Sequence, residues 1–272
     1  MIHLDSKQLS RIINIIVAAS QINSIKLPHM MLRPNIHTII YGRIGSGKSS
    51  ILYEVAKNIE QIPITGFTKA NLMGTVDRES KDLIPPVIWE AKRSLLLVDE
   101  YHLDSKDKGG RSMLNSLLSV LENPKYDRKI SYSARDFKEK DGDLFCRIEK
   151  GRIRVNTRFG LFLNTMMDVI SSDMFEIQAL VSRCIIIPFY PTREQLSRRA
   201  KGEPYYVPKK IKVKERDYIF TKKVYNRIVD FVEAKEVKQE KFLRLVGDIC
   251  RIYVVIRKFD EELFNLIVGL SE

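Results

Sequence analysis

The stretch at residues 42–49, GRIGSGKS, constrains this chain more than any other. It fits the phosphate-binding loop Gly-x-x-x-x-Gly-Lys-Ser, in which backbone N–H groups wrap a polyphosphate, the lysine reaches its terminal phosphates and the serine hydroxyl holds Mg²⁺. An apolar run at 37–41 precedes the loop, and apolar residues at helical spacing follow at 49–59. Strand, glycine loop and helix is the order that such a loop requires, so we predict a nucleoside triphosphate site. Its candidate contacts are Gly42, Arg43, Ile44, Gly45, Ser46, Gly47, Lys48, Ser49 and Ser50.

A second apolar run, at 94–98, ends in the carboxylate pair Asp99 and Glu100, roughly fifty residues beyond the loop. The C-terminal end of a buried strand is where a phosphate-loop enzyme holds its magnesium and the base that orients the attacking water. We therefore assign Asp99, together with Ser49, to Mg²⁺ and Glu100 to the water. An Asp-Glu pair also ends many ordinary strands, but its distance from the loop favours the catalytic interpretation.

Two further apolar runs carry polar residues at their ends. The run at 158–164 ends in Asn164, which in a parallel sheet would lie beside Asp99, within reach of the attacking water or the γ-phosphate. Arg183 stands just before the run at 184–189. It reads either as an arginine finger for a neighbouring subunit's nucleotide or as a surface cation.

The net charge of +12 is unevenly placed. Residues 125–158 hold eleven Lys or Arg against six Asp or Glu, and residues 193–223 hold eleven against four. Blocks of this kind favour a polyanion such as nucleic acid, because phosphate contacts release condensed counterions. The alternative is a solvated, lysine-rich surface.

The first basic block alternates in short runs, with turn signals at 141–142 and 150–151. This pattern predicts a β-hairpin inserted at about 129–158, with Lys150, Gly151 and Arg152 at its tip. A basic tip, with Arg154 behind it, can follow a nucleic-acid backbone. A solvated turn is an equally good interpretation.

The composition indicates the cellular compartment in which the protein is expected. Cys146, Cys184 and Cys250 are far apart and without metal-type spacing, which favours a reducing compartment without structural zinc. No apolar run approaches the roughly eighteen residues of a spanning helix, and the N-terminus carries charges where a signal peptide is apolar. We expect a cytoplasmic protein with no membrane association.

The chain divides into three parts by pattern. Residues 1–34 hold an amphipathic helix and a lead-in, residues 35–190 an α/β nucleotide-binding core with the inserted hairpin, and residues 191–272 a basic linker and a helical unit. The fold class that we expect is therefore α/β: a three-layer α/β/α phosphate-loop NTPase domain with a central, mostly parallel sheet, followed by a small all-helical lid.

The order of these parts resembles the AAA+ ATPases. Within that superfamily the chain is most similar to the motor domain of MCM-type replicative helicases and related pre-sensor-1 hairpin ATPases, through TGFTKANLMGTV, VDEYHL, LSVLE, the basic hairpin, VNTRF, ALVSRC and LRLVGDICR. The resemblance implies ATP and Mg²⁺ as cofactors, a ring that is usually hexameric, a hairpin pointing into a DNA channel, and Arg183 completing the next subunit's site. LRLVGDICR aligns in two registers, so the lid arginine is Arg244 or, as a fallback, Arg251.

These features predict an ATP-hydrolysing motor that acts on DNA as a helicase or a remodelling ATPase in replication. A helicase loader or replication initiator is the nearest alternative. A protein-remodelling machine would need an aromatic pore loop, for which Phe67 is the candidate after the second strand. A structural subunit with a dead site is disfavoured by Lys48, Asp99 and Glu100, which are all present.

Overall fold

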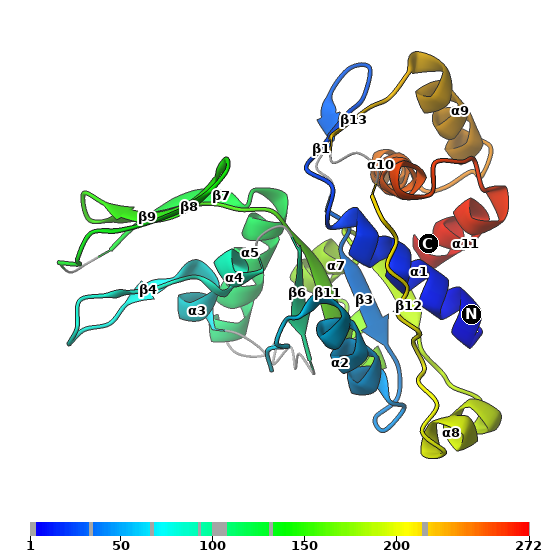
Figure 1. The fold of residues 1–272 in the computed structure, drawn as a ribbon, viewed down its shortest axis with the longest axis horizontal. Coiled ribbons are helices and arrows are strands. Elements are labelled where there is room, and N and C mark those ends of the chain that lie inside the picture. Colours follow the sequence, from blue (N-terminus) through cyan, green and yellow to red (C-terminus); the bar gives the residue numbers. More distant parts are fainter. Residues whose placement is uncertain are drawn as a thin grey trace.

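The computed structural model describes residues 4–32, 35–65, 68–91, 94–99, 108–130, 133–213 and 217–271. A central sheet with helices on both faces occupies the middle of the molecule, an arm of strands and short helices extends to one side, and a helical unit lies at the far end of the sheet from the phosphate loop (Figure 1).

The central sheet is parallel throughout and has the strand order β12-β3-β11-β6. β11 therefore separates the strand that leads into the phosphate loop from the strand that leads to Asp99. Beyond β6 the predicted strand at 61–65 is reduced to one bridge, between Ile64 and Val98. The four strands are β3 (Thr38–Tyr41), β6 (Ser94–Val98), β11 (Phe159–Thr165) and β12 (Ile185–Pro188).

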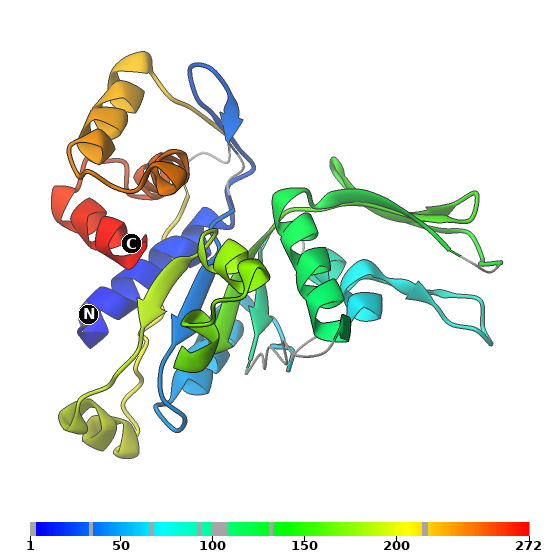
Figure 2. The same cartoon turned by 180° about the vertical axis from the view of Figure 1, so that it is seen from behind.

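This sheet separates two hydrophobic cores, because alternate residues of a strand point to opposite faces. In β6, Leu95 and Leu97 belong to one core, and Leu96 and Val98 to the other. Helices α1 and α2 lie in front of the sheet in Figure 1, whereas α7 lies in front of it in Figure 2, seen from behind. These layers confirm the predicted α/β/α class. The first core includes α1 (Ser6–Ala19) and α2 (Lys48–Ile59), and the second α4 (Val87–Glu90), α5 (Lys108–Glu122) and α7 (Phe175–Val181), which follows the short α6 (Met167–Ile170).

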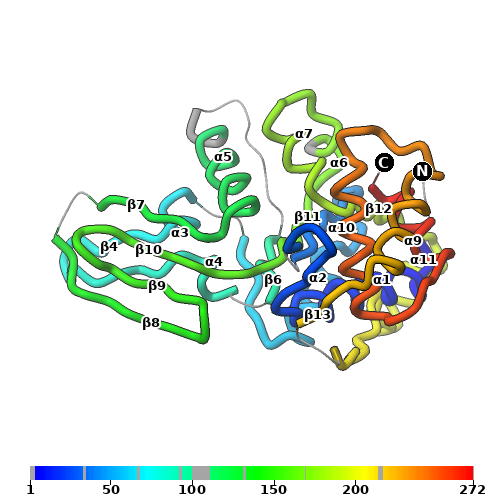
Figure 3. Tube along the Cα trace, turned by 90° about the horizontal axis from the view of Figure 1, so that it is seen from above, coloured from blue at the N-terminus to red at the C-terminus, as the bar shows by residue number. Residues whose placement is uncertain are grey.

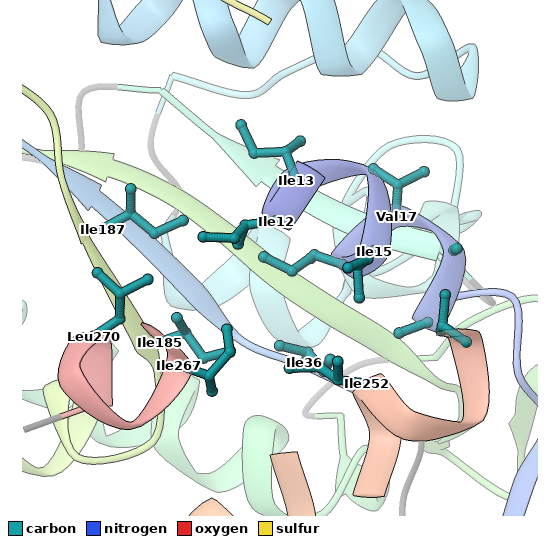
Figure 4. Packing of buried hydrophobic residues seen from close by; sticks show 14 of the residues in the cluster. Ile12, Ile13, Ile15, Val17, Ile36, Ile185, Ile187, Ile252, Ile267 and Leu270 are labelled. Atoms are coloured by element: carbon teal, nitrogen blue, oxygen red, sulfur yellow. The ribbon is translucent and has the colours of Figure 1, made fainter. Parts of the chain in front are cut away.

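The N-terminal helix α1 is held in the first core. It begins where the sequence predicts, because Gln8 N donates to the Asp5 carboxylate at 2.7 Å and Asp5 N donates to Gln8 Oε1 at 3.1 Å. Each fully buried isoleucine of such a helix contributes about 1.5–3 kcal/mol to the free energy of unfolding. Figure 4 shows its apolar residues beside those of β12 and of two C-terminal helices: Ile12, Ile13, Ile15, Val17, Ile185, Ile187, Ile252, Ile267 and Leu270.

The C-terminal unit consists of three helices, as predicted, and α10 packs against α1. The basic stretch before it is more ordered than the sequence indicates: it contains α8, and β13 returns to pair in parallel with β1. The boundaries at 34/35 and 190/191 stay predictions. No helix in the described ranges is long and apolar enough to cross a bilayer. The elements are α8 (Arg193–Ala200), α9 (Lys222–Glu233), α10 (Gln239–Ile256) and α11 (Glu261–Ser271), with β1 (Ser24–Lys26), β2 (Met31–Leu32) and β13 (Asp217–Ile219).

The inserted segment is a four-stranded antiparallel sheet, so the prediction of a single hairpin was wrong in extent. Both expected turns are present, but the sheet begins at Lys125, where only Tyr126 interrupts a run of charges and no apolar alternation marks a strand. Of the run at 130–134, residues 131–132 lie outside the described ranges and the others form no strand. The order is β7-β10-β9-β8 (Figure 3), with β7 (Lys125–Lys129), β8 (Phe137–Asp141), β9 (Leu144–Glu149) and β10 (Arg152–Asn156).

One face of this four-stranded sheet is covered by the segment that precedes β6. The sequence predicts a loop at 66–76, but a capping box between Thr68 and Asn71 starts a short helix there. Val76 and Leu83 pack in the second core with the inward residues of β9 and β10. The covering elements are α3 (Lys69–Met73), β4 (Thr75–Val76), β5 (Leu83–Ile84) and α4.

Candidate functional site

The phosphate loop occupies residues 42–47, between the end of β3 and the first residue of α2. Gly42 must lack a side chain, because a Cβ there would lie 2.3 Å from the carbonyl oxygen of Phe189. Gly47 caps α2 with a φ of 93°, a left-handed conformation that favours glycine. The loop therefore has the conformation that its glycines permit and presents the N-terminus of α2, which attracts anions.

Lys48 is folded into the loop. Its Nζ donates to the carbonyl oxygens of Gly42 at 3.0 Å and of Arg43 at 2.8 Å, and the residue is buried. Ser46 Oγ is buried beside it without a hydrogen-bond partner in the described structure. The Ile44 side chain is 83% exposed and has no polar atom, so only the backbone of this residue can donate a hydrogen bond to a phosphate. A buried ammonium, an unsatisfied hydroxyl and a helix N-terminus together fit a polyphosphate.

Asp99 receives two hydrogen bonds at the same carboxylate oxygen. Ser49 Oγ donates to Asp99 Oδ1 at 2.9 Å, and Asn164 Nδ2 donates to it at 3.2 Å. Asp99 and Asn164 are buried, and Asn164 Oδ1 has no partner among the described residues. The sheet order places Asn164 here, as expected, because β11 runs between β3 and β6.

The oxygens of this cluster fit the cofactors expected from the sequence. Carboxylate and hydroxyl oxygens are ligands that Mg²⁺ prefers, so Asp99 and Ser49 would hold the ion while the loop binds the phosphates of ATP. Asn164 donates to Asp99, and its own Oδ1 has no partner among the described residues, so a bound water would satisfy that oxygen. Glu100, the predicted base, lies outside the described residues.

Tyr205 is a contact of the loop that the sequence does not single out. The segment after β12 turns back, and a Cβ on Gly47 would lie 2.6 Å from Cε2 of the Tyr205 ring. The ring packs edge-on against Phe189 at 5.1 Å, and the Arg199 guanidinium lies 5.6 Å from its centroid. Arg199 also pairs with Glu54 of α2 at 2.8 Å, although burial raises the pKa of that carboxyl above its ordinary value. The sequence feature that could have indicated this contact is a Tyr-Tyr-Val run between two prolines in a basic stretch.

Arg183 lies at the opposite edge of the sheet from the loop. It precedes the N-terminal end of β12, whereas the loop follows the C-terminal end of the parallel strand β3. Its guanidinium donates to the carbonyl of Ala179 at 2.5 Å and forms an ion pair with Glu122, at the end of α5. The side chain is 30% exposed. Within one subunit, Arg183 and the phosphate loop are not brought together.

The two candidate lid arginines also lie away from the phosphate loop of the same chain, so the structure does not bring Arg244 to that loop, and its contact with a nucleotide stays a prediction. Arg244 donates to the carbonyl oxygen of Cys184 at 2.5 Å, beside Arg183. Arg251 is buried and pairs with Asp248 at 2.7 Å. The reason is that α10 packs against α1 and directs Arg244 to the carbonyl of Cys184, just before β12, and the resemblance of LRLVGDICR does not determine how the helix docks.

The three predicted nucleic-acid residues lie in the arm. Lys150 and Gly151 form the turn between β9 and β10 with φ of 51° and 68°. Arg152 and Arg154 do not belong to the turn: they lie on β10, where both pair with Asp127 of β7. Their place is therefore a sheet face rather than a hairpin tip.

Part of the chain matches the model of a known protein family. Residues 38–151 match the family model of the ATPase family associated with various cellular activities (AAA). The match begins in β3 and includes the phosphate loop, β6 with Asp99, and the arm as far as Gly151. No curated protein matches. Together with the parallel sheet and the C-terminal helices, the match assigns the phosphate-loop AAA+ fold with a helical lid and supports ATPase activity.

Proposed function

We propose that this protein is an ATP-hydrolysing AAA+ motor that acts on DNA, as an MCM-like helicase or DNA-remodelling ATPase in replication. The observation that carries the ATPase part is the convergence of Ser49 and Asn164 on Asp99 Oδ1, beside a loop whose lysine and helix N-terminus suit a polyphosphate. Phosphoryl transfer needs positioning and charge stabilisation more than covalent chemistry, and these groups supply both.

Each residue then has a separate task. Lys48 leaves the loop carbonyls to contact the terminal phosphates, and Ser49 and Asp99 hold Mg²⁺, which neutralises charge on the transferred group when bound. Asn164 orients the attacking water through the oxygen that has no partner in the described structure. Glu100 is the base in this proposal.

In this proposal the motor works as a ring, because the Arg183 guanidinium lies at the far edge of the sheet from the loop of its own chain and can act as a finger only at a neighbour's site. A neighbouring copy would bring that edge to the loop and release Arg183 from its ion pair with Glu122. The hexameric ring is carried over from the resemblance to MCM-type motors.

The DNA part of the proposal is supported by charge. The segment 125–158 is inserted as an arm that projects from the nucleotide domain and carries a net charge of +5. A projecting basic arm suits a polyanion that passes beside the subunits.

The first test compares Lys48→Ala with Lys57→Ala, an exposed lysine at the other end of α2. Phosphate release and binding of a fluorescent ATP analogue are measured with and without single- and double-stranded DNA. We expect Lys48→Ala to lose both binding and turnover, Lys57→Ala to match the wild type, and DNA to stimulate the wild type. Stimulation by an unfolded protein and not by DNA would replace this proposal with protein remodelling.

The ring is tested by mixing. Arg183→Ala should bind the analogue normally and lack turnover, and adding it to the Lys48→Ala variant should restore activity, because one mixed interface combines an intact loop with an intact finger. No recovery at any mixing ratio, with mixed assemblies confirmed by sedimentation, contradicts an intersubunit site. A loader or initiator is indicated instead if DNA-bound rings form with ATP but do not unwind a forked duplex.

A further inference from the structure

We propose that the open face of the arm's four-stranded sheet, and not the turn at its end, binds single-stranded DNA. This inference rests on the proposed action on DNA and specifies the surface that carries it. The open face consists of the outward residues of β7, β10, β9 and β8, opposite the side covered by α3, α4 and the β4–β5 hairpin.

Strand register collects the basic residues on this face. Cross-strand partners of an antiparallel pair point to the same side, so Arg154, Arg147 and Lys138 form one row across the sheet. The inward positions of the central strands are apolar and buried, in β9 and β10 alike. Seven Lys or Arg and two Asp or Glu point outward, a net charge of +5. This face therefore accounts for the excess charge of the arm.

The arginines in the middle of the face are fixed by its two carboxylates. Asp127 pairs with Arg152 and, at 3.1 Å, with Arg154, while Glu149 pairs with Arg154 at 3.1 Å and with Arg147 at 3.3 Å. The Arg152 guanidinium holds the pKa of Asp127 below its ordinary value. Ordered guanidinium groups lose little further entropy when they contact a phosphate, which suits a binding platform.

The lysines lie on the two outer strands, in rows on either side of the arginines. Lys125 and Lys129 point outward from β7, and Lys138 and Lys140 from β8, with no ion pair to any of the four in the described part of the chain. Three strand spacings separate the rows, about 14 Å. Asp127, between the two lysines of β7, is paired with Arg152 and Arg154, so the lysines keep their charge available to a polyphosphate backbone.

An aromatic ring lies between these rows. Phe145 points outward from β9, half-buried, between Asn156 of β10 and Lys140 of β8. The Arg147 guanidinium lies 5.0 Å from the centroid of its ring. A ring on a basic sheet is the arrangement on which unpaired bases stack, and a duplex keeps its bases inside, so the face favours a single strand.

The turn offers much less. Both of its central residues, Lys150 and Gly151, have left-handed backbone conformations, and Lys150 is its one cation. Arg152, predicted at the tip, and Arg154, predicted behind it, both belong to the face. A contact at the turn alone would use one charge, whereas the face offers seven.

The test measures fluorescence anisotropy of a labelled oligo(dT) over a range of salt concentrations. Lys138→Ala/Lys140→Ala and Lys125→Ala/Lys129→Ala should each lower the slope of log K against log salt by about 1.4, since each phosphate contact to a single strand contributes about 0.7. Phe145→Ala should weaken binding about 5- to 150-fold with the slope unchanged. Lys150→Ala should change the slope by at most about 0.7.

The matched control is Lys57→Ala/Lys238→Ala, two exposed lysines outside both basic segments, at the end of α2 and just before α10, which should bind like the wild type. Circular dichroism and thermal melting check that each variant is folded. Wild-type protein that binds no oligonucleotide would overturn the proposed action on DNA itself. If the wild type binds the oligonucleotide, the face variants still bind it and Lys150→Ala does not, only the choice of surface is overturned. If the face variants still bind oligo(dT) but no longer bind polyglutamate, the face binds an acidic protein instead. If they still bind oligo(dT) but no longer self-associate, the face binds a second copy of the chain.

Discussion

The side chains of Asn164 and Asp99, 65 residues apart, are joined by a hydrogen bond of 3.2 Å between Nδ2 and Oδ1. The contact follows from register: Leu163 pairs with Val98, so the next residue of each strand lies at the same edge of the sheet. Because one N–H of the Asn164 amide donates to the Asp99 carboxylate, the amide oxygen is held in a fixed direction. That oxygen has no partner among the described residues and is therefore available to a water beside the nucleotide.

Asn164→Ala should lower the rate of ATP hydrolysis by about 10²-fold while leaving nucleotide affinity close to that of the wild type. The reason is that one preorganised group is lost from the reacting centre, and the loop that binds the phosphates is untouched. Single-turnover hydrolysis and equilibrium binding separate the two effects. Asn226→Ala, an exposed asparagine on α9, serves as the control. Wild-type turnover in the Asn164 variant would remove this residue from the mechanism.

A buried ion pair inside α10 should dominate the stability of the helical unit. Asp248 pairs with Arg251 at 2.7 Å and Arg244 at 3.4 Å, and burial lowers the pKa of the Arg251 guanidinium. Asp248→Ala leaves these cations without their carboxylate, so we expect a loss of about 3–5 kcal/mol in the free energy of unfolding. Urea denaturation measures it, with the exposed Asp230→Ala as control at less than about 0.5 kcal/mol.

Replacing both partners separates this effect from simple loss of packing. Asp248→Leu/Arg251→Met removes the carboxylate together with its closer partner and leaves Arg244 its hydrogen bond to the carbonyl of Cys184. The double variant should recover most of the stability lost in Asp248→Ala, because well-packed apolar residues avoid the desolvation of a buried ion. A double variant as unstable as the single one would indicate that α10 depends on shape and not on charge.

The cysteines should resist thiol reagents in the native protein. Cys146, Cys184 and Cys250 are free and buried, and burial raises the pKa of Cys184 and of Cys250 to about 12. A raised pKa keeps the thiol protonated: at pH 8 about 10⁻⁴ of such a group is thiolate. Labelling with a chromogenic disulfide should be slow at pH 8 and complete in denaturant. Asp248→Ala should speed the labelling of Cys250, and rapid labelling of the native wild type would contradict the packing of α10.

The sequence was informative wherever one local pattern fixes one structure. Residues 95–98 are apolar without a break, and β6 spans Ser94–Val98. The glycine loop, the alternation in β9 and the helical spacing in α9 and α10 were as clear. Adjacency of Asn164 and Asp99 was predictable as well, since the ends of parallel strands meet at one edge.

What the sequence did not reveal depends on tertiary contacts. The residues of β7 are charged except for Tyr126, so the sequence is typical of a turn region. The segment is a strand because it pairs with β10. Arg244 fits a helical face in either register, but the docking of α10 on α1 turns it toward Cys184 and away from the loop. Tyr205 lies in a stretch without periodicity, and its role arises because the chain folds back over Gly47.

Gly47 and Tyr205 should therefore be energetically coupled. An alanine at position 47 must hold a left-handed backbone, which costs about 1–2 kcal/mol, and its Cβ would also collide with the Tyr205 ring at 2.6 Å. Gly202 is the matched control, because its φ is 92° and no atom lies within 4 Å of a Cβ placed there. Gly202→Ala should lower the free energy of unfolding by the backbone cost alone, and Gly47→Ala by clearly more, as measured by urea denaturation.

Removing the ring should relieve the collision. Tyr205 is buried, so Tyr205→Ala alone should cost about 3–5 kcal/mol. Because the smaller residue makes room for the new Cβ, Gly47→Ala/Tyr205→Ala should lose less than the two single variants added together, with a coupling of about 1 kcal/mol or more. Additive losses would mean that the ring moves aside without cost and that the segment after β12 does not press on the phosphate loop. Coupling would show that the segment after β12 packs against the phosphate loop at Gly47, the N-cap of α2.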